Sequence, residues 1–184
     1  ESEHFSTVCT DNDEVGLMAA TKIRQKGYTE AAIFASRHSY FATSQRVQAF
    51  ISSCERLGIE TDEKYILKGS STRNGGYEIG KQYAALKEPP KMIFCDSDAI
   101  ALGALRAFHE EGISVPGDAE LLSIGMLDPE AASYYVPSLS VVEMPNKEIG
   151  QQVLRLMRKK VLNNDMSSEH VKVHAKLMLR ESFS

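Results

Sequence analysis

The sequence predicts an α/β fold built on a doubly wound parallel sheet. Short apolar runs alternate with helix-length amphipathic segments up to about residue 126. Three of the amphipathic segments end in glycine, at Gly27, Gly58 and Gly112, and each glycine leads into the next apolar run. Because crossovers between parallel strands are right-handed, this alternation places helices on both faces of one sheet.

Composition is that of a soluble globular protein. The 184 residues suffice for one large or two small packed units, and 42% are hydrophobic and 25% charged. A net charge of −4 gives no electrostatic footprint for nucleic acid. No apolar run approaches the ~20 residues of a membrane span, and the acidic, polar start does not look like a secretory leader. We therefore expect a cytoplasmic protein that makes no membrane contact.

The three cysteines are expected to be buried free thiols. Cys9, Cys54 and Cys95 are far apart and odd in number, and each lies in an apolar pattern. A disulfide framework or a metal site needs closer or paired spacing. Free thiols also fit a reducing cytoplasm.

The predicted elements follow from the spacing of apolar residues and from the residues that typically begin or end helices and strands. Apolar runs predict strands at 5–10, 31–35, 65–67, 92–95, 121–124 and 139–143, with a period-2 segment at 171–179. Helical spacing is kept over 15–23, 47–57, 79–86, 100–108 and 149–161, where Pro145 is expected at the first helical position. The first strand and the elements after residue 143 do not fit on the central sheet, which indicates pieces of an incomplete second lobe.

The segment from Lys91 to Met126 has the pattern of a complete strand–helix–strand unit. Its first apolar run ends in the acidic turn Asp96–Ser97–Asp98. In open α/β sheets, ligands bind at the carboxyl ends of the strands. Four loops are expected to meet at that edge, at residues 36–46, 69–73, 96–98 and 125–128.

These four loops carry Arg46, Tyr40, hydroxyl groups and several carboxylates. A guanidinium and a set of hydroxyls suit a small polyhydroxylated or anionic molecule. The alternative is that the loops are polar because they are exposed, with Arg46 solvated on the first turn of its helix. Residue spacing alone does not choose between the two interpretations.

An enzymatic alternative arises from the D-x-D spacing of Asp96 and Asp98. Two carboxylates at a strand end can hold Mg²⁺ or supply a nucleophile, as in haloacid-dehalogenase-type phosphatases. That chemistry also needs a further acidic pair, whereas the next strand is followed by Asp128 alone. Asp98 is placed to cap its helix, and His170 and His174 are too far apart in a strand to share a metal. We expect no enzyme activity, no metal and no cofactor.

A set of short motifs occurs in order along nearly the whole chain. They are DN at 11–12, GY at 27–28, RVQAF at 46–50, IF at 93–94, SDAIALGAL at 97–105, GISVPGD at 112–118, SIG at 123–125, YVPSLSVV at 135–142, IG at 149–150 and LRES at 179–182. Together they resemble the effector-binding core of the LacI (lactose-repressor) family of bacterial transcription regulators. The LRES ending resembles the regulators more than their periplasmic sugar-binding relatives.

The resemblance implies two Rossmann-like, periplasmic-binding-protein-like lobes joined by three crossovers. Residues 14–142, with a return segment at 176–184, would form the carboxyl-terminal effector-binding lobe. Residues 1–13 and 143–175 would be segments of an incomplete amino-terminal lobe. The family's helix-turn-helix domain would lie upstream, so contact with DNA would be made outside these residues.

The resemblance also implies a site for a sugar-like or nucleobase-like effector. Arg46 matches the family's ligand-gripping arginine, and Glu14, Ser71 and Ser97 occupy ligand-contact positions. Where the family has Gly-aromatic-Asp-Asp, this chain has Gly125 to Asp128, with Leu127 in place of an acid. Loss of that acceptor would weaken hydroxyl recognition by roughly 1.5–3 kcal/mol.

The family relation further implies a homodimer that contacts its partner through Leu102, Tyr134 and Tyr135. Leu102 lies off the apolar stripe of its helix, which favours an interface independently of the resemblance. The alternative function is that of a periplasmic-type sugar- or solute-binding protein.

Overall fold

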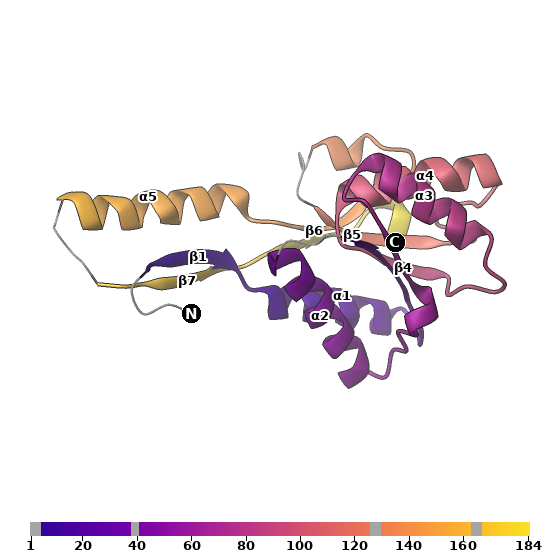
Figure 1. The fold of residues 1–184 in the computed structure, drawn as a ribbon, viewed down its shortest axis with the longest axis horizontal. Coiled ribbons are helices and arrows are strands. Elements are labelled where there is room, and N and C mark those ends of the chain that lie inside the picture. The colour runs from indigo at the N-terminus through magenta and orange to yellow at the C-terminus, as the bar shows by residue number, and fades with distance from the viewer. Residues whose placement is uncertain (1–4, 38–40, 126–129, 163–166) are drawn as a thin grey trace.

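The computed structural model describes residues 5–37, 41–125, 130–162 and 167–184 (Figure 1). Its α-helices are α1 Asn12–Gln25, α2 Phe41–Arg56, α3 Arg73–Ala84, α4 Asp98–Glu111 and α5 Asn146–Leu162. Its strands are β1 Thr7–Thr10, β2 Ala32–Ser36, β3 Ile66–Gly69, β4 Met92–Cys95, β5 Glu120–Gly125, β6 Ser140–Glu143, β7 His170–Val173 and β8 Lys176–Met178. Short 3₁₀ helices occupy Glu63–Tyr65, Ala131–Ser133 and Glu181–Phe183.

A six-stranded sheet with the order β3-β2-β4-β5-β6-β8 forms the centre of the broad end of the molecule. The first five strands are parallel, and β8 pairs with β6 in the antiparallel sense at the edge. Helices α1 and α2 lie on one face of the sheet and α3 and α4 on the other (Figure 1). The predicted doubly wound α/β fold is confirmed.

Each face of the sheet has its own apolar core. On one face, Phe50 of α2 stacks on Phe94 of β4 with ring centroids 3.9 Å apart. On the other face, Phe34 of β2 makes an edge contact with Phe108 of α4 and with Tyr83 of α3. β2 and β4 are buried on both faces, as expected for the inner strands of a parallel sheet.

A smaller unit forms the narrow end of the molecule (Figure 1). There β1 and β7 make a two-stranded parallel sheet, and α5 packs against it. Three connections lead to the larger unit, between β1 and α1, between β6 and α5, and between β7 and β8. The predicted single segment at 171–179 is therefore two strands, because the chain changes sheet at 174–175. The assignment of residues to two lobes stays a prediction.

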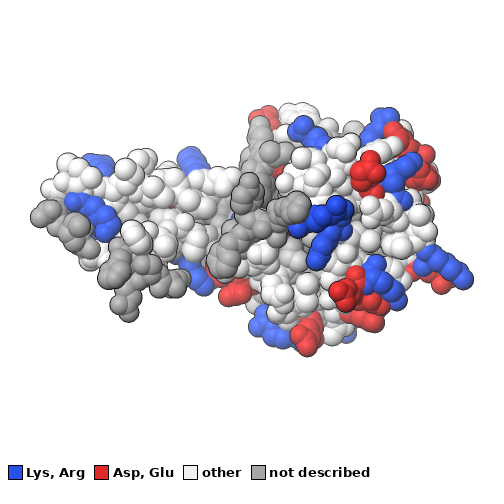
Figure 2. Space-filling view, viewed as in Figure 1, with Lys and Arg blue, Asp and Glu red and all other residues white. Residues whose placement is uncertain are grey.

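Helix α5 exposes most of its apolar stripe. Leu156 is its one buried residue, whereas Val153, Met157 and Val161 are exposed, as is Leu154. The narrow end is largely white in Figure 2, while acidic and basic side chains are interspersed over the broad end. No helix in the described ranges combines the length and apolarity needed to cross a membrane.

The helix ends expected from the sequence are confirmed at three glycines. Gly27, Gly58 and Gly112 have φ angles of 89°, 67° and 72°, which favour glycine after each helix. Helix α2 begins at Phe41, earlier than expected, within the segment predicted as a loop. The expectation for Cys9 is wrong: its side chain is exposed, because β1 has a single neighbouring strand among the described residues.

Helices α3 and α4 approach so closely that glycine is required between them. A Cβ built on Gly103 of α4 would lie 1.9 Å from the carbonyl oxygen of Arg73, and one on Gly76 of α3 would lie 2.1 Å from that of Ile100. These contacts involve backbone atoms, so a side chain cannot be accommodated by a rotamer change.

We predict that Gly103→Ala lowers the free energy of unfolding by about 1–3 kcal/mol, because α3 and α4 must separate. Urea unfolding followed by circular dichroism measures the change. The control is Gly150→Ala on α5, where a Cβ meets nothing within 4 Å and alanine favours the helix by up to about 1 kcal/mol. Equal effects of the two substitutions would contradict the packing described.

Candidate functional site

The carboxyl ends of four neighbouring strands lie along one edge of the large sheet. β3, β2, β4 and β5 are parallel and end at Gly69, Ser36, Cys95 and Gly125. The segments that follow these strands bring together residues from well-separated parts of the chain. This is the edge at which the sequence predicts a ligand site.

Arg46 lies in α2 and is buried, with 7% of its surface exposed. Its Nε donates a hydrogen bond to Oδ1 of Asn12, the first residue of α1, at 3.2 Å. Burial lowers the pKa of the guanidinium, and attraction to the Asp96 carboxylate opposes that shift. A solvated first-turn arginine is therefore excluded, and Arg46 is a cation held inside the protein.

Asp96 follows β4 directly and is 1% exposed. Its N–H donates to the Phe34 carbonyl at 2.9 Å, and its Oδ2 accepts from the Ser36 N–H at 2.6 Å. Two buried atoms, Asp96 Oδ1 and Ser36 Oγ, have no hydrogen-bond partner in the described part of the chain. Buried polar atoms are rarely left in this state, and those that are often mark a functional site.

Burial is the main reason that the pKa of Asp96 is raised above its ordinary value. The Ser36 N–H, the Ser97 side chain and the charge of Arg46 act in the opposite direction. The sequence prediction placed Asp96 in the acidic turn expected to form a wall of the effector site and weighed it as a metal ligand, but did not include it among the individual effector contacts. The available signal was an acid directly after four apolar strand residues, where its side chain has little access to water.

Ser97, rather than Asp98, is the N-cap of α4, which corrects the predicted cap. The Ser97 hydroxyl accepts from the Ile100 N–H at 3.5 Å, and Asp98 is the first helical residue. Ser71 is exposed in the turn after β3, between Ser70 and Thr72, whose hydroxyl groups lie 2.9 Å apart. Ser97 and Ser71 thus follow strands that end at the same edge.

Glu14 lies on the first turn of α1 and contacts the connection between β7 and β8. Its Oε2 lies 2.8 Å from Nδ1 of His174. The described partner of Glu14 is therefore on that connection. The predicted ligand residues Tyr40, Leu127 and Asp128 lie outside the described residues.

The three predicted dimer residues differ in exposure. Tyr134 is 75% exposed, Leu102 on α4 is half-buried, and Tyr135 is half-buried against the core beneath α3 and α4. Exposed apolar surface fits an interface best at Tyr134. The dimer stays a prediction.

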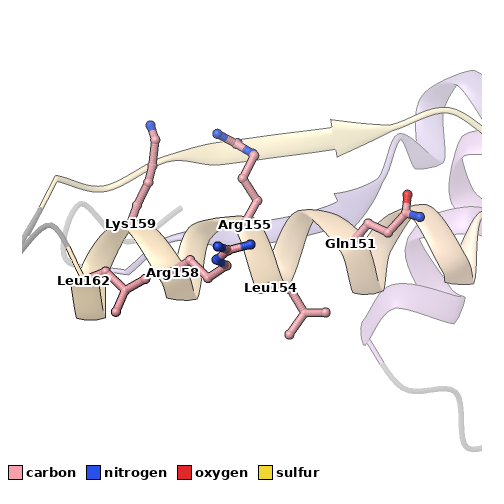
Figure 3. A pocket seen from close by; sticks show the side chains of 6 residues that line it. All are labelled: Gln151, Leu154, Arg155, Arg158, Lys159 and Leu162. Carbon is pink, nitrogen blue, oxygen red and sulfur yellow. The ribbon is translucent and has the colours of Figure 1, made fainter.

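Two depressions are lined by residues other than Arg46 and Asp96, although the first includes Asn12, which accepts the hydrogen bond from Arg46. One, of about 730 Å³, is polar and includes Asn12, Gln45 and Lys172. The other, of about 450 Å³, runs along α5 (Figure 3), where Leu154 and Leu162 point away from the strands and Arg155 and Lys159 point towards them. Arg155 and Lys159 both pair with Glu169, at 3.1 and 2.6 Å. Within the described ranges, no group of three metal-ligating side chains is present.

The doubly wound sheet, the three connections to a second unit and the polar strand-end edge are features of a periplasmic binding protein-like domain. The model of that domain family matches residues 20–183.

Named relatives give a closer assignment. A LacI family transcription regulator from Clostridium acetobutylicum is 30% identical, with a TM-score of 0.92 over 98% of this chain and 67% of its own. The HTH-type transcriptional repressor PurR of Mannheimia succiniciproducens is 27% identical over 92% of this chain and 50% of its own. The chain belongs to the LacI family and forms an effector-binding core of that family. It spans about half the length of the PurR repressors it matches.

A third relative has the same fold with a ligand. The LacI family transcriptional regulator from Enterococcus faecium with bound ribose is 20% identical, with a TM-score of 0.86 over all of this chain and 67% of its own. At this identity the likeness concerns the fold alone.

We predict that Asp96→Asn stabilises the protein at neutral pH. Because the pKa of Asp96 is raised in the folded state, stability falls as pH rises from the unfolded value near 3.8 through the folded one. The amide carries no charge to desolvate, so the variant gains stability above this window and gains none below it. Thermal unfolding between pH 3.5 and 7.5 measures the difference.

Asp118→Asn is a control that is expected to change stability in the opposite direction. Hydrogen bonds from Ser114 lower the pKa of Asp118, so its carboxylate stabilises the folded state at neutral pH and loses that contribution as pH falls. The asparagine variant is expected to be less stable than the parent at pH 7. An Asp96→Asn variant that also loses stability at pH 7 would show that burial does not dominate at Asp96.

Proposed function

We propose that the chain is the effector-sensing and dimerising part of a bacterial LacI-type transcription regulator. A small sugar-like or nucleobase-like molecule would bind at the strand-end edge, between the two lobes. Its binding would alter DNA recognition by a helix-turn-helix domain outside these residues. The observation that carries the proposal is the buried Arg46 beside a buried carboxylate with an unpaired oxygen.

The chemistry of this edge favours binding over catalysis. Arg46 offers planar donors, Ser97 and Ser71 offer hydroxyls, and Asp96 offers an acceptor. The matched relatives are transcriptional repressors and regulators, and ribose is bound to one regulator of the same fold. By the same resemblance, Tyr40, Glu14, Leu127 and Asp128 complete the proposed site.

Signal transfer follows from two lobe arrangements with different affinities for the effector. A ligand shifts the equilibrium by as much as its affinity differs between the arrangements. The three connections are the segments at which the lobes would turn relative to one another. A changed lobe angle in a dimer would alter the spacing of two DNA-reading helices, to which half-site recognition is sensitive.

We propose that α5, β1 and β7 belong to an amino-terminal lobe completed by residues outside this chain. The matched repressors are about twice as long as the chain. Helix α5 also presents Leu154, Met157 and Leu162 to solvent, and a helix with apolar residues on a second face usually packs on both sides. In this proposal the regulator is cytoplasmic, and Leu102, Tyr134 and Tyr135 contact the second copy.

We predict that the full-length protein is stabilised by its effector and that Arg46→Ala removes the effect. A ligand at 100 times its dissociation constant adds about 2.7 kcal/mol to stability. Thermal shift with pentoses, hexoses, their phosphates and nucleobases measures it, and Arg56→Ala serves as a control at the last residue of the same helix. If no compound raises the melting temperature, or if Arg46→Ala responds like the parent, the effector role is wrong.

We predict that Leu154→Gln has different consequences in the two lengths of protein. In the 184-residue chain, where Leu154 is 62% exposed, the change should stay within about 0.5 kcal/mol. In the full-length protein it should cost about 2 kcal/mol or more, because the completed lobe buries this face. Leu156→Gln, at a 6% exposed position, should destabilise both. A neutral Leu154→Gln in the full-length protein would contradict the proposed lobe.

A further inference from the structure

The strand-end edge contains a buried cation and a buried anion of this chain. Arg46 and Asp96 are both at least nine-tenths buried and attract each other electrostatically. Both charges lie at the strand-end edge, where each influences the binding of a charged group. Since desolvation weakens the competition from water, each charge has a strong effect on what can bind there.

Asp96 also has free hydrogen-bonding capacity at this edge. Its Oδ2 is used by the Ser36 N–H, whereas its Oδ1 has no partner among the described residues. The Ser36 hydroxyl oxygen likewise has no hydrogen-bond partner among the described residues. The backbone hydrogen bond places the two residues side by side, so one unpaired acceptor and one unpaired hydroxyl lie at the ends of neighbouring strands.

The combination selects among ligand classes. An anionic group of a ligand would be attracted by Arg46 and repelled by Asp96. An ammonium group would be attracted by Asp96 and repelled by Arg46. A neutral hydroxyl opposes neither charge, because it can donate to a carboxylate oxygen and accept from a guanidinium or a serine. Such a group also satisfies the two buried atoms that the folded chain leaves unpaired.

We propose that Asp96, with Ser36, is a specificity-determining residue that makes the site select an uncharged, hydroxyl-bearing effector over its anionic counterpart. This inference rests on the function proposed above. It gives this chain an acceptor at residue 96, while Leu127 stands where the sequence resemblance expects an acid. The acid that would grip a hydroxyl is thereby supplied from β4 instead of from the segment after β5.

The test compares neutral sugars with their phosphates. Isothermal titration calorimetry on the full-length protein measures dissociation constants for D-ribose and D-ribose 5-phosphate, and for D-glucose and D-glucose 6-phosphate. The parent should prefer the neutral member of whichever pair it binds. Asp96→Asn should shift the ratio towards the phosphate by about tenfold or more, because one buried negative charge is removed. Ser36→Ala should weaken both members of the pair to a similar degree and leave their ratio unchanged, because the Ser36 hydroxyl contact is common to both and the charge of Asp96 discriminates between them.

A matched control removes one acidic charge from the opposite end of the sheet. Glu63 is exposed in the 3₁₀ helix that precedes β3, so Glu63→Gln should leave the ratio as in the parent. Preference of the parent for the phosphate, or an unchanged ratio in Asp96→Asn, would overturn the inference while leaving an effector site in place. Failure of all four sugars and of the wider screen would overturn the proposed function and this inference with it.

Discussion

The hydrogen bond from the Ser36 N–H to Asp96 Oδ2 fixes the geometry of the candidate site. It continues the pairing of β2 and β4 one residue beyond the sheet, together with the bond from the Asp96 N–H to the Phe34 carbonyl. Both strands are buried on both faces, so neither end can shift without disturbing the two cores. The bond thereby holds a carboxylate in place at the strand ends, and that carboxylate attracts Arg46 from α2.

This arrangement opposes stability. A buried carboxylate with an unused oxygen costs free energy of folding that a hydrophobic residue would not. The remainder of the domain is closely packed, with glycines that bring α3 against α4 and a stacked phenylalanine pair beneath α2. A rigid frame that retains an unsatisfied polar group at a strand end is what binding to a preorganised site requires.

Much of the large unit could be predicted because its signals are local. Apolar runs bounded by Gly27, Gly58 and Gly112 mark the strands and helix ends, and burial on both faces makes the strand runs continuous. The secondary structure and strand pairing of the chain ends were harder to predict from the sequence. The period-2 pattern at 171–179 is the same whether one strand or two are formed, and the partners that divide it are more than 30 residues away.

The candidate site, too, could be predicted only in part from the sequence. Arg46 was predicted by its place in a motif, and its burial follows from α2 packing on the sheet. The turn that contains Asp96 was predicted as part of the site, but Asp96 itself was not predicted as an effector contact, because the sequence records an acid but not the Ser36 N–H that orients it. The exposed face of α5 and the exposed Cys9 differ from an ordinary core pattern because few described neighbours pack there. Periodicity indicates which face is apolar, whereas burial depends on what lies opposite.

The most direct measurement is a crystal structure of the full-length protein with the compound that gives the largest thermal shift. The account predicts a ligand between the lobes, with one oxygen within hydrogen-bonding distance of the Arg46 guanidinium and a hydroxyl donating to Asp96 Oδ1. A ligand bound elsewhere, such as in the polar depression beside Asn12 and Gln45, with Arg46 and Asp96 untouched, would contradict it.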